Sequence, residues 1–159
     1  MENAELINNY QKYLNYSEQF KRLNKAIING FNLEAIFIEY AIMEDRTESI
    51  LRHSGYWDSY IKSRKGREPN MDTKIKYIIK KAENRTDYLH KYFSDNTLEQ
   101  ILKWKEERNR LIHALLKQKL NENEIRNLAI WGDTLTKVIR TKASSYNRYV
   151  ERKRFNGML

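Results

Sequence analysis

The chain has 159 residues and a net charge of +9, from 30 Lys and Arg against 21 Asp and Glu, which favours polyanionic partners. It has no cysteine, which excludes disulfides and thiolate metal sites. Hydrophobic residues make up 40% of the chain, with only five Gly and one Pro, so we predict one all-α domain over residues 1–159. No apolar run is long enough to cross a membrane and the acidic start is no signal peptide, so we expect a cytoplasmic protein that does not bind membranes.

The first half of the chain carries two predicted helices. Apolar residues recur at helical spacing over residues 3–28, and Asn29-Gly30 ends this pattern. A second helix is predicted to begin at the N-cap Asn32 and to stop near Ser54-Gly55, a length of about 33 Å.

Residues 55–71 hold two glycines and the only proline, and we predict one long loop there. Basic side chains lie among aromatic ones in this loop, a mixture that suits single-stranded RNA. The alternative is a solvated loop whose aromatic residues are tucked into the core. The predicted RNA-binding residues are Lys62, Arg64, Lys65, Arg67 and Tyr60.

The second half of the chain is also helical. Asp72 can cap a short helix, Asp87 to Phe93 is predicted to form another turn or two, and residues 97–118 form the most strongly periodic segment. A final helix is predicted from about Glu122, and residues 155–159 form an expected frayed tail. The economical architecture is an antiparallel bundle of four to five helices.

Arg108 is a charged residue on an apolar helix face. At about 100° per residue, Ile101, Trp104 and Leu111 project within roughly 60° of it, and His113 falls about 140° away at the edge of the apolar stripe. A guanidinium in such a place needs an anion or a set of acceptors, because isolation would cost several kcal/mol. A structural ion pair within the bundle is the alternative to a functional role.

Glu44 occupies a similar place on the second predicted helix, among apolar neighbours such as Phe37 and Leu51. Two opposite charges therefore point inward. We expect Glu44 to orient Arg108 across the bundle, and Glu48, about 40° away, is an alternative partner.

The segment Glu107-Arg108-Asn109-Arg110-Leu111-Ile112-His113 resembles the motif of the HEPN superfamily, in which Arg and a following polar residue precede His by four to six intervening positions. The all-helical plan, the late position of the motif and an inward acidic residue on an earlier helix extend the resemblance over about residues 30–145. Some toxins of this superfamily carry a tyrosine two residues after the histidine, which their antitoxins modify. Leu115 stands there in this chain, so that mode of neutralisation is not expected.

The resemblance implies a HEPN-like fold and a metal-independent endoribonuclease, often a toxin or antiviral effector, whose site forms at a homodimer interface. Arg108 and His113 would be catalytic, with Asn109, Glu44 and Glu48 in support, and neither a metal nor a cofactor is expected. Histidine suits proton transfer near pH 7, and Arg108 would neutralise charge on the phosphorane. The expected partners are RNA, a second copy, and an antitoxin or defence complex.

Two other functions remain open from the sequence. One is a non-catalytic HEPN-like module that binds RNA or protein and keeps the motif for dimer packing. The other is a basic DNA-binding regulator, although the chain shows no helix-turn-helix spacing with a clear recognition helix.

Overall fold

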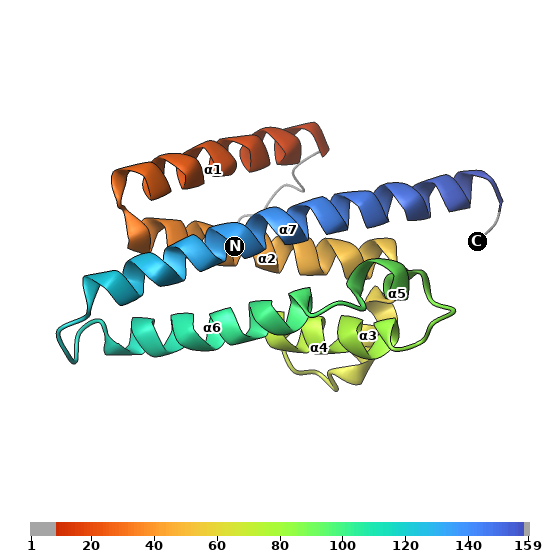
Figure 1. The fold of residues 1–159 in the computed structure, drawn as a ribbon. Helices are drawn as coiled ribbons and strands as arrows, with labels where there is room; N and C mark the ends of the chain where they lie inside the picture. The colour runs from red at the N-terminus through yellow and green to blue at the C-terminus, as the bar shows by residue number, and fades with distance from the viewer. Residues whose placement is uncertain (1–8, 158–159) are drawn as a thin grey trace, which may run out of the picture.

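The computed structural model describes residues 9–157, which form seven helices and no strand (Figure 1). The all-α prediction is confirmed, but the predicted count of four to five helices is too low for this part of the chain, because three short helices form between the long ones. The helices are α1 (Asn9–Asn29), α2 (Asn32–His53), α3 (Trp57–Ser63), α4 (Met71–Ala82), α5 (Tyr88–Phe93), α6 (Thr97–Ala114) and α7 (Glu122–Phe155).

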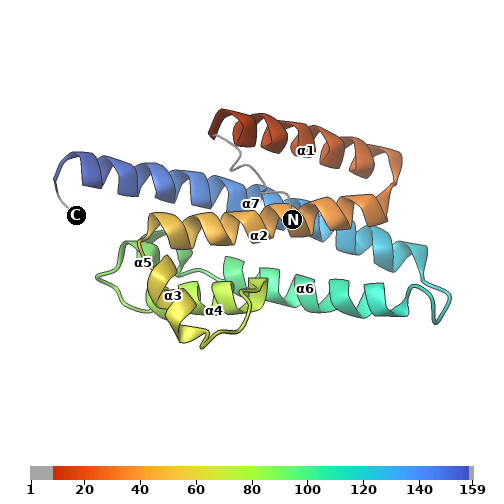
Figure 2. The same ribbon diagram turned by 180° about the vertical axis from the view of Figure 1, so that it is seen from behind.

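The long helices α2 and α7 pack along each other at the centre of the molecule. Helix α1 lies on one side of this pair, and α4 and α6 lie on the other (Figures 1 and 2). The hairpins α1–α2 and α6–α7 are antiparallel as predicted, whereas α2 and α7 run in the same direction. This parallel pair arises because α6 carries the chain back to the end of the molecule where α2 begins.

Side-chain caps define several helix starts. Asp87 accepts a hydrogen bond from the Leu89 amide at 2.8 Å, and Asn121 accepts one from the Asn123 amide at 2.9 Å, so both helices begin near their predicted positions. The predicted cap Asp72 is wrong, because Asn70 accepts from the Thr73 amide. Similarly, Asn32 is the first residue of α2 rather than its cap.

The predicted loop over residues 55–71 is wrong for Trp57–Ser63, which forms α3. The remaining turn contains Lys65 and Gly66, both with positive φ. At the other end, α7 continues to Phe155, so this first residue of the predicted frayed tail belongs to the helix. Residues 158 and 159 of that tail, like residues 3–8 of the first predicted helix, lie outside the described residues. None of the helices within residues 9–157 combines the length and apolarity needed to cross a bilayer.

A buried carboxyl group lies where α2 meets α7. Glu39 is 0% exposed, and neither of its carboxyl oxygens has a hydrogen-bond partner among the described residues. Burial, with a smaller effect of the Asp133 carboxylate, raises the pKa of Glu39 to about 9. Glu39 is therefore protonated and neutral at pH 7.

Gly132 of α7 makes room for this carboxyl group. A Cβ at position 132 would lie 2.0 Å from Glu39 Oε2 and 2.7 Å from Trp104 Nε1. Trp104 is fully buried, and its indole N–H donates to the Leu128 carbonyl at 3.0 Å. The absence of a side chain at Gly132 thus lets α2, α6 and α7 meet closely.

Candidate active site

Arg108 lies on α6 and reaches the aromatic face of α2, as its place on the apolar stripe predicts. The guanidinium carbon is 4.5 Å from the ring centroid of Tyr40 and 5.3 Å from that of Phe37. The side chain is half-buried, and its Nε has no hydrogen-bond partner among the described residues. The faces of the aromatic rings stabilise the positive charge. They do not accept conventional hydrogen bonds from the N–H groups of the guanidinium.

The predicted pairing of Arg108 with Glu44 or Glu48 is wrong, because both carboxylates face Lys74 of α4. Lys74 Nζ lies 3.0 Å from Glu48 Oε2 and 3.7 Å from Glu44 Oε1. The Lys74 side chain is buried and needs this compensation more than the half-buried Arg108 does. Burial opposes ionisation of Glu48, but hydrogen bonds from Lys74 and Arg52 outweigh it and lower the pKa of that carboxyl group.

Arg108 consequently has no carboxylate partner among residues 9–157. Its one side-chain hydrogen bond runs from Nη1 to Asn109 Oδ1, at 3.2 Å. Asn109 is neutral and leaves the positive charge uncompensated. A guanidinium held on aromatic rings with free N–H groups is well suited to bind a phosphate or another oxyanion.

Tyr40 is a neighbour of this group that the sequence did not identify as part of the site. Burial raises the pKa of its hydroxyl, the charges of Glu44 and Asp72 add to the effect, and Arg108 opposes it. The hydroxyl is therefore neutral at pH 7, on a ring whose centroid lies 4.5 Å from the guanidinium carbon. The only sequence feature that could have identified Tyr40 is its position four residues before Glu44, on the same face of α2.

His113 lies in the last turn of α6 and is exposed. No described residue forms a hydrogen bond or ion pair with its imidazole. It lies five positions after Arg108 on the helix, which corresponds to a rise of about 7.5 Å and a rotation of about 140°. Within one copy, the two side chains therefore do not converge on one point.

The predicted RNA-binding residues of the α3 region differ in exposure: the four basic residues reach the surface and Tyr60 does not. Lys62, Lys65 and Arg67 are exposed, and the half-buried Arg64 donates to the Glu68 carbonyl at 3.2 Å. The prediction for Tyr60 is wrong, because it is 0% exposed and its hydroxyl is bonded to Thr73 Oγ1 at 2.9 Å. It cannot stack on a base.

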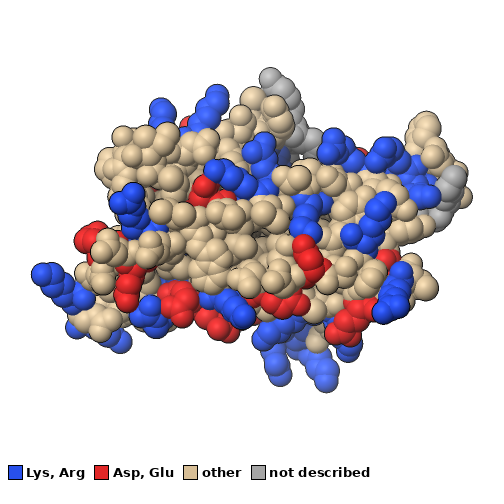
Figure 3. All heavy atoms as spheres, viewed as in Figure 1, with Lys and Arg blue, Asp and Glu red and all other residues tan. Residues whose placement is uncertain are grey.

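The α3 region also lies near the opposite end of the molecule from the C-terminal end of α6 (Figure 1). One copy therefore does not bring His113 together with the exposed lysines and Arg67. On the face seen in Figure 3, Lys and Arg are dispersed, with Asp and Glu among them along the lower edge. The net positive charge of the chain does not form one continuous patch on this face.

Comparisons with known proteins give no match: no protein-family model, no curated protein and no solved structure is similar to this chain. The geometry around Arg108 and His113 is therefore the basis for assigning a function.

Proposed function

We propose that the protein is a metal-independent endoribonuclease of the HEPN type, with a composite site at a homodimer interface. The observation that carries this proposal is the state of Arg108. It is half-buried on the rings of Phe37 and Tyr40 and has no carboxylate partner among residues 9–157. A cation kept in such a place without compensation costs stability, and an RNA phosphate is the anion that a basic protein of this kind would bind there.

The proposed reaction is a transesterification at one phosphodiester. An imidazole of His113 removes the proton of the ribose 2′-OH, and the 2′-oxygen attacks the phosphorus. Arg108 stabilises the negative charge of the phosphorane. The P–O5′ bond then breaks, and an imidazolium protonates the leaving 5′-oxygen. The products are a 2′,3′-cyclic phosphate and a free 5′-OH.

A homodimer supplies what one copy lacks. The reaction needs a base and an acid, and each copy offers one exposed His113 on its α6. Phe37, beside Arg108, is 51% exposed and gives this face an apolar element that a two-fold interface would cover. In such a dimer, His113 of the second copy would approach the Arg108 of the first.

The alternative function is a non-catalytic helical module that binds RNA or a protein. One observation favours it: no described residue orients the imidazole of His113 in a single copy. A role as a toxin or antiviral effector, with an antitoxin or defence-complex partner, rests on the motif resemblance alone.

The test is RNA cleavage in EDTA by the native protein and by His113→Ala. We expect the native protein to cleave RNA but not its 2′-deoxy analogue, and His113→Ala to lose the activity at unchanged helix content. His53→Gln is the control, because that imidazole contacts the Ser49 carbonyl and Glu151 and is no part of the proposed site. An RNA that stays intact with every version of the protein would favour the binding module.

A further inference from the structure

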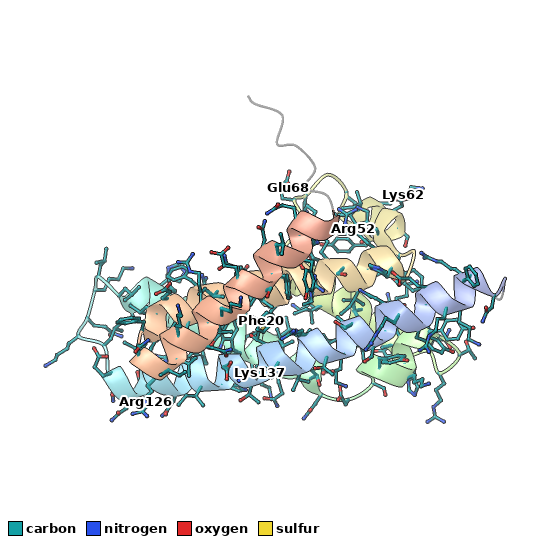
Figure 4. All side chains as sticks on the ribbon, turned by 90° about the horizontal axis from the view of Figure 1, so that it is seen from above. Phe20, Arg52, Lys62, Glu68, Arg126 and Lys137 are labelled. Carbon is teal, nitrogen blue, oxygen red and sulfur yellow. The ribbon has the colours of Figure 1, made fainter. Side chains whose placement is uncertain are left out.

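A second cationic site lies between α1, α2 and α7. The cleft there has a volume of about 460 Å³, which is within the usual range of small-molecule sites. Figure 4 views the molecule from this side, with Phe20 labelled between α1 and α7. Its principal lining residues are Tyr13, Tyr16, Phe20, Lys21, Arg46 and Arg140.

Two arginines of this cleft lie over aromatic rings. The guanidinium carbon of Arg46 is 4.2 Å from the ring centroid of Tyr16, and that of Arg140 is 4.2 Å from the centroid of Phe20. Contact with a ring face stabilises a guanidinium without using its N–H donors, which can then meet an oxyanion. Arg140 makes no hydrogen bond with any described residue, so its N–H groups remain available to an oxyanion, whereas Arg46 donates from Nε and Nη2 to Asp45.

The charges in the cleft are only partly compensated. Asp45 pairs with Lys12 at 2.9 Å and also with Arg46. Lys21 and Arg140 have no carboxylate partner among residues 9–157. With one carboxylate against four cations, the cleft keeps a positive charge that favours an anionic ligand.

An unpartnered hydroxyl lies in the same cleft. The Tyr16 hydroxyl is buried and makes no hydrogen bond with any described residue. Burial raises its pKa, with Arg46 and Arg140 opposing and Asp45 adding to the effect, so it stays protonated. A buried hydroxyl without a partner costs free energy, and a ligand oxygen would remove this cost.

We infer that this cleft binds a small organic phosphate that carries a planar ring. The phosphate would lie against Arg140 and Lys21, and the ring would stack on Tyr13, which is 68% exposed. The cleft is separate from the candidate active site, because α1 and α6 lie on opposite sides of α2 (Figures 1 and 2). A free nucleotide and the 5′-phosphorylated end of an RNA strand share the required chemistry.

The test is calorimetric titration with AMP, inorganic phosphate and adenosine at low salt. We expect AMP to bind at least about tenfold more tightly than either fragment, because it alone engages both the cations and the ring. Arg140→Gln should weaken AMP binding at least about tenfold. Tyr13→Ser should reduce AMP affinity toward that of phosphate. Arg140 and Tyr13 are both exposed, so these variants should fold.

Arg126→Gln is the matched control, since it removes the same charge from an exposed position of α7 outside the cleft (Figure 4). Equal affinities of Arg140→Gln and Arg126→Gln for AMP would overturn the proposal. The absence of AMP binding at millimolar concentration would overturn it as well. A 5′-phosphorylated trinucleotide distinguishes an RNA end from a free nucleotide as the ligand. If the trinucleotide binds more tightly than AMP and its binding depends on Arg140, the ligand is an RNA end. If it binds no more tightly than AMP, the ligand is a free nucleotide.

Discussion

At the scale of single residues, the two inward-facing cations Lys74 and Arg108 have different surroundings. Lys74 is buried and meets two carboxylates, whereas Arg108 is half-buried and meets two aromatic rings. A buried ammonium without a counter-charge would be deprotonated or would destabilise the fold. Arg108 avoids that cost because part of it still reaches solvent, and its charge stays available for a ligand.

Glu39 should make stability fall with rising pH. Its pKa is about 9 in the folded chain against 4.5 for an ordinary glutamate, so the folded state holds a proton that the unfolded state loses between these values. The contribution is complete below pH 4.5 and decreases by up to about 1.4 kcal/mol per pH unit until about pH 9. Urea unfolding at pH 5, 7 and 9 should show a much flatter profile for Glu39→Gln.

The control for this measurement is Glu18→Gln on α1, where the side chain is exposed. Its pH profile should follow that of the native protein. If the profiles of Glu39→Gln and the native protein run parallel, the buried carboxyl group does not titrate as we describe.

At the same scale, sequence periodicity located Arg108 but not its partners. Periodicity places a side chain on one face of its own helix, so Arg108 and Glu44 were both recognised as facing inward. It carries no information on which helices are neighbours. Lys74 lies on α4, and only the tertiary arrangement brings it to Glu44 and Glu48. Tyr60 was misplaced for a related reason, because a short helix buries it.

At the scale of helices, Gly132 controls the approach of α2 to α7. Gly132→Ala should destabilise the protein by about 1–3 kcal/mol, because the new methyl group would overlap the Glu39 carboxyl. The gain of about 1 kcal/mol in helix propensity offsets only part of this. Urea unfolding of the variant measures the difference.

A second substitution separates steric overlap from other effects. In a Glu39→Ala background, the overlap with the carboxyl group is absent and only the close approach to Trp104 Nε1 remains, so Gly132→Ala should cost less than in the native background. Equal costs in both backgrounds would show that the contact with Glu39 does not determine the residue at position 132.

The helices themselves could be predicted well because their signals are local. Helices α5 and α7 begin near their predicted positions, where Asp87 and Asn121 cap them, although the predicted caps Asn32 and Asp72 are not caps. Helix α3 escaped prediction because seven residues with flanking glycines carry too little periodicity to distinguish a helix from a loop.

At the scale of the whole molecule, the parallel arrangement of α2 and α7 places α6 and α1 on opposite sides of the central pair. The α2–α6 side carries Arg108 and the exposed ring of Phe37. The sequence could not give this arrangement, because helix direction within the bundle depends on how the connecting segments turn.

If the protein forms the proposed dimer, substitution of Phe37 should weaken it. Phe37→Ser should raise the dissociation constant of the dimer at least about tenfold, because it removes an apolar side chain from the interface. Sedimentation over a concentration series measures this. Ile28→Ser on α1, where the side chain is 82% exposed, should leave the assembly unchanged. A protein that sediments as a monomer at every concentration would contradict a composite site.

The central claim is that Arg108, which has no carboxylate partner among residues 9–157, binds a phosphate of RNA. The most direct measurement compares RNA cleavage rates of Arg108→Gln and Arg110→Gln in EDTA, since the neighbouring Arg110 is exposed and paired with Glu107 at 2.9 Å. We predict that Arg108→Gln loses at least about 100-fold in rate, while Arg110→Gln stays near the native rate, at similar thermal stability. Equal rates for the two variants would contradict the assignment of Arg108.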